Sequence, residues 1–452
     1  MLSNAAKQTG PGLSAIPRYL SAVLSQGLVS GFHFVLNLLL VKLLSLTDFG
    51  IYALTFVAAV MAAAISNALV STPLCVYAPS AKSDQEREQI QTMLTTLMSL
   101  LVGAGLALGL IASFTFADQS MSFYTLLAAT GFVASYLARQ YSRSFGYSRF
   151  DVIGVLYGDT SYVVSGAVLI SLTLWNSGSL SAAEVFSLLT LANLLAILVE
   201  LKRLPFNMDV MNVKRAMDSY RHIWLQSRWA LIGAVTTIVV SQAHSIVVSL
   251  LKSPAAYAPL AAGFVIFGPV RVVFSTIQNV LKPEMALAVS NHHYSDARRQ
   301  MLAVSGLSLL AVIGLAVLTL LFWPFLSSYL YAEQYAHAPM QQIVALWAGI
   351  TMIAAIQNGP FTALQAMKKF RPLALSSVYG SILSLVLVTL AVTLAPVQWS
   401  ILGILLAEGF VAAWVVILSL RCFRQSQSKQ QTSVDANTHE HSHSCRGSQL
   451  SR

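Results

Sequence analysis

Long apolar runs separated by short polar connections dominate the chain. A helix that crosses a lipid bilayer needs about 20 mainly apolar residues, and about twelve runs approach or exceed that length. These runs lie near residues 19–44, 49–78, 91–116, 121–139, 152–174, 183–201, 223–251, 257–281, 301–322, 340–366, 373–395 and 400–420. The pattern predicts an all-α polytopic membrane protein with about 12 transmembrane helices.

The composition agrees with this pattern and excludes several classes of protein. Of the 452 residues, 56% are hydrophobic and 10% are charged, whereas a soluble domain carries about 25% charged residues. An ordinary soluble enzyme, a disordered protein and a typical nucleic-acid-binding protein are therefore excluded. The net charge of +10 can be interpreted only from the positions of the basic residues along the chain.

Lysine and arginine are distributed very unevenly over the connections. When alternate connections are assigned to opposite sides, 23 of the 27 basic residues fall on the side that holds both termini. The other side holds only Lys252, and the remaining three basic residues lie inside predicted helices. Because the cytoplasmic connections of membrane proteins are rich in lysine and arginine, we expect both termini to be cytoplasmic.

The connections also predict the domain organisation. The longest inner connection, 202–222, is predicted to be a cytoplasmic linker between an N-terminal six-helix lobe (1–201) and a C-terminal six-helix lobe (223–420). The tail, 421–452, is polar and rich in Ser, Gln and His, so we expect it to be disordered. The longest outer connection, about 323–339, leaves no room for an extracellular domain.

The turn between the first two predicted helices carries a motif within VKLLSLTDFGIYAL (41–54). Its residues are Leu44, Asp48, Phe49, Gly50 and Tyr52. Together with the twelve-helix pattern and the segment VLKPEMA (280–286), this turn resembles the polysaccharide-transporter branch of the multidrug/oligosaccharidyl-lipid/polysaccharide (MOP) exporter superfamily. That branch contains O-antigen and exopolysaccharide flippases.

The resemblance implies a fold, a function and partners. The fold would be two six-helix lobes around a central cavity. The protein would be a flippase of the bacterial inner membrane that moves a polyprenyl-diphosphate-linked oligosaccharide by alternating access, for surface polysaccharide biosynthesis. Its partners would be the lipid-linked oligosaccharide, the lipid bilayer, and the polysaccharide polymerase and export machinery.

A basic and polar stripe on the eighth predicted helix is the first candidate for a substrate cavity. Its members, spaced to share one helix face, are Arg271, Ser275, Gln278 and Lys282. Placing an ionisable residue inside a membrane costs free energy, so such residues often mark functional sites. The guanidinium of arginine can bind two phosphate oxygens at once. The stripe therefore predicts a cavity for a diphosphate. The alternative is an arginine paired with an acid between packed helices.

A polar stripe on the first predicted helix is the second candidate. It consists of Gln26, Ser30, His33 and Asn37. Such side chains suit sugar hydroxyls, or a protonatable step at His33, and hydrogen bonding between helices is the alternative. Lys42, near the outer end of this helix, is a further candidate for the cavity, or a lysine whose charge reaches the membrane interface.

Four further positions have two interpretations each. Arg228, near the cytoplasmic end of the seventh helix, is a phosphate contact or an interfacial anchor. Asp159 is an ion-coupling site for a proton or sodium, or the partner of an arginine. Gly359 and Pro360 predict a bend or break that serves as a hinge or is a structural kink. For Glu408 we expect an ion pair with a basic residue.

The sequence gives no sign of an enzyme or of a cofactor. It contains neither a phosphate-binding Walker A loop nor a GxSxG nucleophile motif. His439, Glu440 and His443 match the HExxH spacing of zinc proteases, but they lie in the polar tail with no fold around them. We therefore expect no catalytic site, no cofactor, no metal site and no nucleic-acid partner.

Two alternative functions stay open. A cation-coupled multidrug exporter of the same superfamily would need an acidic site in its N-terminal lobe, and Asp159 is the candidate for it. A membrane polysaccharide polymerase or ligase would need a large outer loop with catalytic residues, whereas the longest outer connection here is about 323–339. The flippase is the leading hypothesis.

Overall fold

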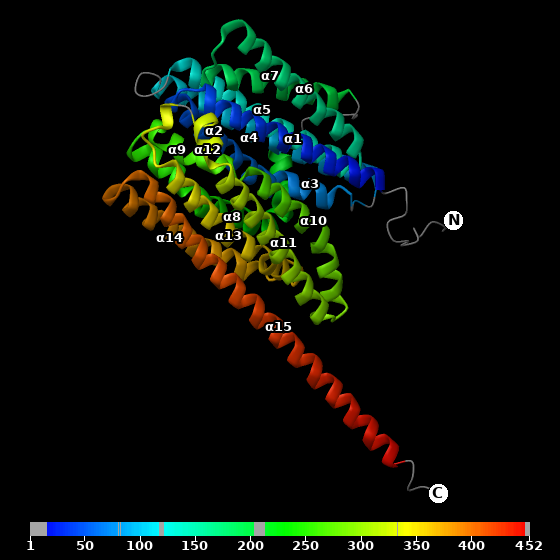
Figure 1. The fold of residues 1–452 in the computed structure, drawn as a ribbon. Helices are drawn as coiled ribbons and strands as arrows, with labels where there is room; N and C mark the ends of the chain where they lie inside the picture. The colour runs from blue at the N-terminus through cyan, green and yellow to red at the C-terminus, as the bar shows by residue number, and fades with distance from the viewer. Residues whose placement is uncertain are drawn as a thin grey trace. The chain divides into compact units, whose positions relative to one another are not determined.

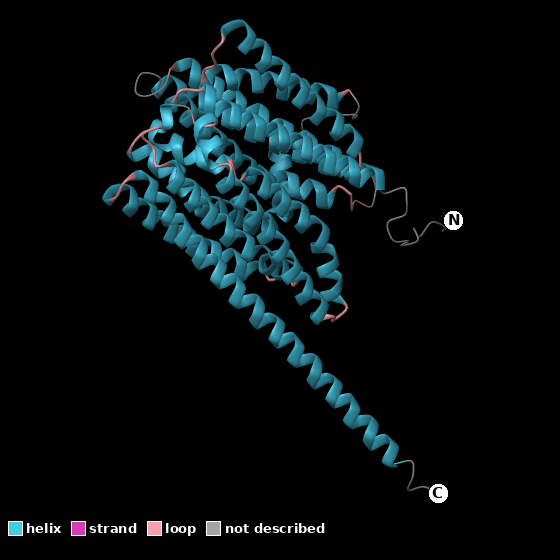
Figure 2. Ribbon diagram, in the orientation of Figure 1, coloured by secondary structure: helices cyan, strands magenta, loops and turns pink. Residues whose placement is uncertain are grey.

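The computed structural model describes residues 16–79, 81, 83–116, 122–202, 213–331 and 333–447, with the side chains from 427 onward and a few others left undescribed. These residues are almost entirely helical and contain no strand (Figures 1 and 2). The prediction of an all-α protein is confirmed.

Within the described ranges, the chain forms 15 α-helices with short connections. The first seven are α1 (Ile16–Leu43), α2 (Leu46–Ser66), α3 (Thr72–Tyr77), α4 (Asp84–Phe116), α5 (Phe123–Ser148), α6 (Val152–Ser177) and α7 (Ala182–Leu201). The others are α8 (Val213–Leu251), α9 (Pro254–Val265), α10 (Gly268–Ser290), α11 (Tyr294–Leu321), α12 (Trp323–Tyr329), α13 (Met340–Ala366), α14 (Phe370–Leu394) and α15 (Ser400–Gly447). A π-helical turn, Asn67–Ser71, joins α2 to α3.

The helices identify a multi-pass membrane protein. Among the described residues, ten helical segments are long and apolar enough to cross a membrane, and eleven if the bent pair α9 and α10 forms one span. The remaining predicted run corresponds to α5, which has 26 residues but carries Arg139, Gln140 and Arg143 in its second half. Every one of the twelve predicted runs therefore coincides with one or two observed helices.

The motif turn at 45–52 has a structural role in the fold. Ser45 caps α2 by accepting a hydrogen bond from the backbone N–H of Asp48 (3.1 Å), and the Asp48 carboxylate accepts one from the N–H of Ala182 at the start of α7 (3.2 Å). Phe49 and Tyr52 are fully buried. A side chain at Gly50 would collide with the backbone carbonyl of Pro254, so the glycine permits close packing of α2 on α9.

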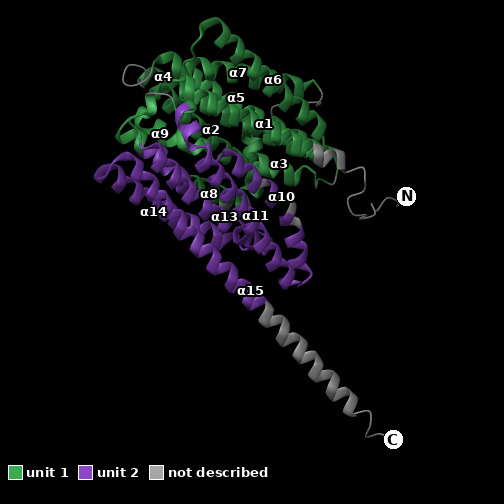
Figure 3. Ribbon diagram, viewed as in Figure 1, with its two compact units in different colours: residues 1–238, 248–265, 329–338 green, residues 239–247, 266–328, 339–452 purple. Residues whose placement is uncertain are grey.

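Two compact units make up the chain, and neither is continuous in sequence (Figure 3). Unit 1 contains residues 1–238, 248–265 and 329–338, and unit 2 contains residues 239–247, 266–328 and 339–452. The predicted division into lobes at 202–222 stays a prediction. Residues 203–212 of that linker lie outside the described residues, and the helix α8 begins at Val213, inside it.

The C-terminal helix extends into the polar tail. Helix α15 leaves the apolar segment and continues to Gly447. No proline or glycine interrupts the sequence between Phe410 and Arg446, and its Gln, Lys, Ser and Ala residues tolerate helical conformation. A preceding apolar helix removes the cost of starting a new one. The disorder expected of residues 421–452 stays a prediction.

Candidate functional site

Unit 1 contains a buried group of charges that joins α5 to α6. The guanidinium of Arg139 lies 2.7 Å from Asp159 Oδ1, and Nε of Arg143 lies 3.1 Å from the same oxygen. Ser25 of α1 donates a hydrogen bond to the other carboxylate oxygen, Oδ2. The side chains of Arg139 and Asp159 are 1% and 0% exposed. We call Arg139, Arg143, Asp159 and Ser25 the arginine–aspartate cluster.

A second layer of polar and aromatic groups surrounds this cluster. The Arg139 guanidinium lies 3.8 Å from the centre of the Tyr162 ring, and the Tyr162 hydroxyl lies 3.3 Å from His33 Nε2. The buried carboxylate of Glu200 accepts a hydrogen bond from Ser142. Buried charges are tolerated in a low-dielectric interior when they are paired and hydrogen-bonded, and this arrangement provides that pairing for Asp159.

Local helical geometry builds the cluster. Arg139 and Arg143 are four residues apart and so share one face of α5, while Asp159 and Tyr162, three apart, share one face of α6. The absence of a side chain at Gly158 leaves room for Glu200, which a Cβ at that position would contact. Helices α5, α6 and α7 can therefore approach each other closely at this level.

The positions of Arg139 and Arg143 within a helix were not expected from the sequence. The apolar run ends near 139, so both were counted among the 23 basic residues on the side of the termini. Both lie within α5, where Arg139 is buried and Arg143 is mostly buried against Asp159. The signal that could have found them is the pair of arginines spaced by four residues next to a helix with a lone acid. Asp159 is thus the partner of arginines, one of its two predicted roles.

The polar stripe on α1 divides between the cluster and its own helix. Gln26 accepts a hydrogen bond from Arg143 (3.4 Å) and donates one to Ser30 (3.2 Å). His33 reaches the cluster through Tyr162, whereas Asn37 donates to the backbone carbonyl of His33 (2.6 Å). The structure therefore brings Gln26 and His33 toward the cluster, and leaves Ser30 and Asn37 in bonds within α1.

Lys42 lies at the end of α1 against a segment from far along the chain. Its ammonium is 3.9 Å from the centre of the Tyr329 ring. Nearby, the Gln334 amide donates to the carbonyls of Val41 (3.1 Å) and Leu44 (2.9 Å), which satisfies acceptors at the helix end. Residues 329–338 belong to unit 1, and this cation–π contact supplies Lys42 with a structural partner.

In unit 2, the predicted stripe on α10 splits into exposed charges and a buried network. Arg271 and Lys282 are exposed, and the charge of Arg271 interacts with that of Glu408 on α15. Gln278 donates instead to Asn358 of α13, whose amide donates to Ser308 of α11 (2.8 Å). Gln278 therefore links α10, α13 and α11 by hydrogen bonds.

The side chain of Ser275 lies outside the described residues. Arg228 is exposed in the unit 1 part of α8.

Helix α13 continues through Gly359 and Pro360 without a break, and a bend at these residues stays a prediction. Proline cannot donate to the carbonyl four residues earlier, which is that of Ile356. The hydroxyl of Ser305 on α11 donates to this carbonyl instead (2.8 Å), and accepts a hydrogen bond from Gly359 N–H (3.2 Å). The serine therefore replaces the missing donor, and the hinge role stays a prediction.

The described residues offer no group of three or more His, Cys, Asp or Glu side chains that could hold a metal ion. The HExxH sequence at 439–443 lies where side chains are not described.

The fold is shared with transporters of the MOP superfamily. No family model matches the sequence, and no curated protein does either. The structure resembles an inward-facing multidrug resistance MATE family transporter of that superfamily, with a TM-score of 0.68 and 9% identity over 91% of this chain and 96% of the other. An outward-facing transporter of the same description gives a TM-score of 0.57 and 13% identity, over 92% and 96% of the two chains.

A flippase has the same fold. The inward closed conformation of the lipid II flippase MurJ matches with a TM-score of 0.65 and 14% identity, over 91% of this chain and 90% of that one. At these identities the likeness establishes the fold alone. This chain is therefore a multi-pass membrane protein with the architecture of MATE transporters and MurJ.

Proposed function

We propose that the protein is a flippase that moves a polyprenyl-diphosphate-linked oligosaccharide across the bacterial inner membrane, by alternating access, for surface polysaccharide biosynthesis. The motif turn at 44–52 supports the polysaccharide-transporter branch, and the fold is compatible with flipping a lipid-linked sugar because one protein that shares it is a lipid II flippase. The termini would be cytoplasmic. A polysaccharide polymerase and export machinery would act on the translocated sugar.

The sign of the accessible charge in the spans carries this proposal. Arg271 is exposed in α10, whereas Asp159 is buried and engaged by two guanidinium groups. An exposed arginine attracts a diphosphate and repels a cationic drug. Arg271 also interacts with Glu408, so substrate binding would exchange one anionic partner for another. Lys282, exposed on the same helix, would provide a second cation.

The multidrug exporter is the second candidate, because the MATE transporter with a TM-score of 0.68 shares the fold at least as well as MurJ does. Its cation coupling would need Asp159 to release the arginines during transport. The polymerase or ligase is less well supported, since the outer connection around 323–339 is partly taken up by α12 and by contacts with the end of α1.

Reconstitution tests the proposal. The protein is placed in liposomes whose inner leaflet carries a polyprenyl-diphosphate-linked oligosaccharide, and external glycan-cleaving enzyme measures its appearance outside. We expect cleavage to depend on the protein and to fall at least about tenfold in Arg271→Ala, since a charged hydrogen bond contributes about 1.5–3 kcal/mol. Arg298→Ala, which removes an exposed arginine at the start of α11, should keep full rate.

The possible results separate the two ideas. Unchanged translocation in Arg271→Ala keeps the flippase and rejects Arg271 as a substrate contact. An absence of translocation with several lipid-linked sugars, combined with resistance of cells to toxic cations, rejects the flippase in favour of the exporter.

A further inference from the structure

The first four turns of α8 precede its membrane-spanning part and are packed on unit 1 along one side. The apolar span in α8 is Ala230–Leu251, so residues 213–229 lie before it. The packed side consists of Ala216, Tyr220, Ile223 and Ser227, all buried. The Tyr220 hydroxyl donates to the carbonyl of Leu69 (2.6 Å), and burial raises the pKa of this hydroxyl, which stays a neutral donor. One face of the segment is thus fixed.

An apolar stripe lies exposed beside this packed side. Val213, Met217 and Trp224 are 47%, 55% and 43% exposed. Spacings of four and eleven residues place the three on nearly the same line along a helix. Large apolar side chains gathered on an exposed face mark a surface that binds a membrane or another partner.

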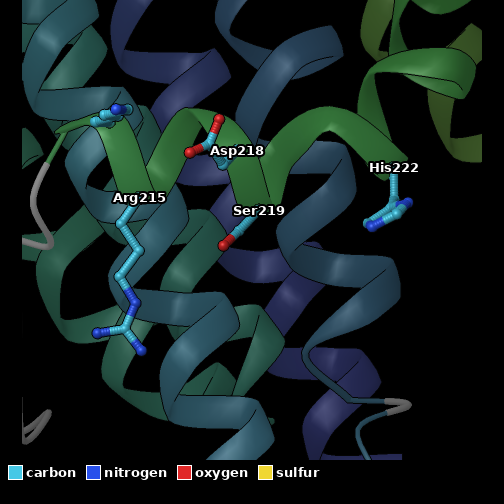
Figure 4. Close-up of a pocket in the computed structure, with 5 residues that line it drawn as sticks. Arg215, Asp218, Ser219 and His222 are labelled. Atoms are coloured by element: carbon cyan, nitrogen blue, oxygen red, sulfur yellow. The ribbon is translucent and has the colours of Figure 1, made fainter.

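A basic stripe runs parallel to the apolar one. Lys214, Arg221 and Arg228 are spaced by seven residues, close to two helical turns, and all three are exposed. The next positions around the helix include Arg215 and His222, which with Lys214, Asp218 and Ser219 line an open hollow of about 500 Å³ (Figure 4). Asp218 is the only acid in the sequence of α8.

The two stripes together have the chemistry of a lipid-binding surface. Helices that lie at a membrane surface combine lysine and arginine with tryptophan and aliphatic residues. Clusters of basic residues next to a spanning helix attract anionic lipid head groups. Arginine holds a phosphate through two hydrogen bonds, while the neighbouring apolar side chains meet the upper part of the acyl chains.

We propose that residues 213–228 form a docking surface for anionic phospholipids of the leaflet that they face. Phosphates bind along Lys214, Arg221 and Arg228, and acyl chains contact Val213, Met217 and Trp224. The spacing favours several phospholipids over one diphosphate: a step of seven residues is about 10.5 Å and the whole basic stripe about 21 Å. Arg228 thereby takes the second of its two predicted roles, the interfacial anchor.

The proposal is tested by lipid retention, which does not depend on transport. Phosphatidylglycerol or phosphatidylcholine is titrated onto the delipidated full chain in neutral detergent, and bound lipids are counted by native mass spectrometry. The test variant combines Lys214→Gln, Arg221→Gln and Arg228→Gln. The control variant removes the same charge from exposed positions elsewhere by Arg298→Gln, Arg299→Gln and Lys369→Gln.

We expect wild type and control to prefer phosphatidylglycerol, and the test variant to bind it on the order of 100-fold more weakly, since each basic residue near an anionic surface contributes about fivefold. Raising the salt concentration should abolish the preference in wild type. A second variant, Met217→Ser with Trp224→Ser, keeps all charges and should also bind less phosphatidylglycerol. Equal melting temperatures of the variants and the wild type exclude unfolding as the cause.

Three results overturn the proposal: no preference of the wild type for phosphatidylglycerol, an equal loss in the control variant, or displacement of bound phosphatidylglycerol by a stoichiometric amount of polyprenyl diphosphate. The last result would assign the surface to the transported lipid instead.

Discussion

The buried carboxylate of Asp159 is held by three donors from two other helices. Arg139 and Arg143 contact one oxygen, and Ser25 contacts the other. Isolated charges cannot remain in an apolar interior without a large desolvation cost. The aspartate therefore neutralises arginines that would otherwise destabilise the packing of α5 inside unit 1. This arrangement predicts that Asp159 stabilises the folded protein.

The variant Asp159→Asn tests that role. It leaves two buried guanidinium groups without their anion, and we expect a loss of about 3–5 kcal/mol of stability, since breaking a buried pair has this cost. The measurement is thermal unfolding in detergent. The double variant Arg139→Gln with Asp159→Asn should recover part of the loss, because it also removes one of the unpaired charges.

The opposite outcome identifies an ion-coupling site. If Asp159→Asn unfolds at the wild-type temperature but abolishes cation-dependent transport, then the arginines are not its obligatory partners and the exporter becomes the better hypothesis.

At this scale, the sequence could show which single residues are costly in a membrane but not which residues meet. Asp159 is conspicuous as an acid in an apolar run, whereas Arg139 stands where the apolar run ends and resembles a cytoplasmic residue. The pairing depends on the rotation of α5 against α6. Hydropathy contains no information about that rotation, so the arginines were missed.

At the scale of elements, the apolar runs predicted where the helices lie. They did not predict where the helices begin and end, because some helices continue into polar sequence. Helix α8 begins at Val213 and α15 ends at Gly447, well beyond the apolar runs at 223–251 and 400–420. Residues outside the bilayer core can stay helical once an apolar segment has started the helix. Pro360 does not interrupt α13, because Ser305 donates to the carbonyl of Ile356 the hydrogen bond that proline cannot supply.

Close approach of α11 and α13 leads to a prediction about glycine. A Cβ at Gly359 would collide with the backbone carbonyl of Met301, and backbone cannot move aside as a flexible side chain can. We expect Gly359→Ala to lower the stability by about 1–3 kcal/mol, the usual cost of overpacking. The measurement is the change in melting temperature of the purified protein.

The matched control is Gly306→Ala, five residues after Met301 on α11, where nothing lies within 4 Å of the added methyl. It should be neutral or more stable by up to about 1 kcal/mol, since alanine favours a helix over glycine. Equal effects of the two substitutions would show that the approach of α11 and α13 is not tight.

At the scale of the whole molecule, the class of fold followed from the sequence, whereas the place of residues 329–338 in unit 1 did not. Twelve apolar runs are enough to predict a multi-pass helical protein. The assignment of residues 329–338 to unit 1 depends on contacts such as those of Gln334 with Val41 and Leu44, almost 300 positions earlier in the chain. A single glutamine in a loop gives no sign of such a distant partner.

The orientation in the membrane is the last prediction, and it follows from charge. Lys252 stands alone between α8 and α9, whereas Arg299 at the start of α11 is one of many basic residues on the other side; both are exposed. Because connections rich in lysine and arginine stay in the cytoplasm, Lys252 should face outward and Arg299 inward.

Labelling of cysteines tests this orientation. In a background with Cys75, Cys422 and Cys445 replaced by serine, we expect Lys252→Cys to react with a membrane-impermeant maleimide in spheroplasts. Arg299→Cys should react only after the membrane is opened. Reaction of Arg299→Cys in intact spheroplasts, with Lys252→Cys protected, would reverse the orientation. It would also place the basic stripe of α8 at the outer leaflet, so that the phospholipids it binds would be those of that leaflet.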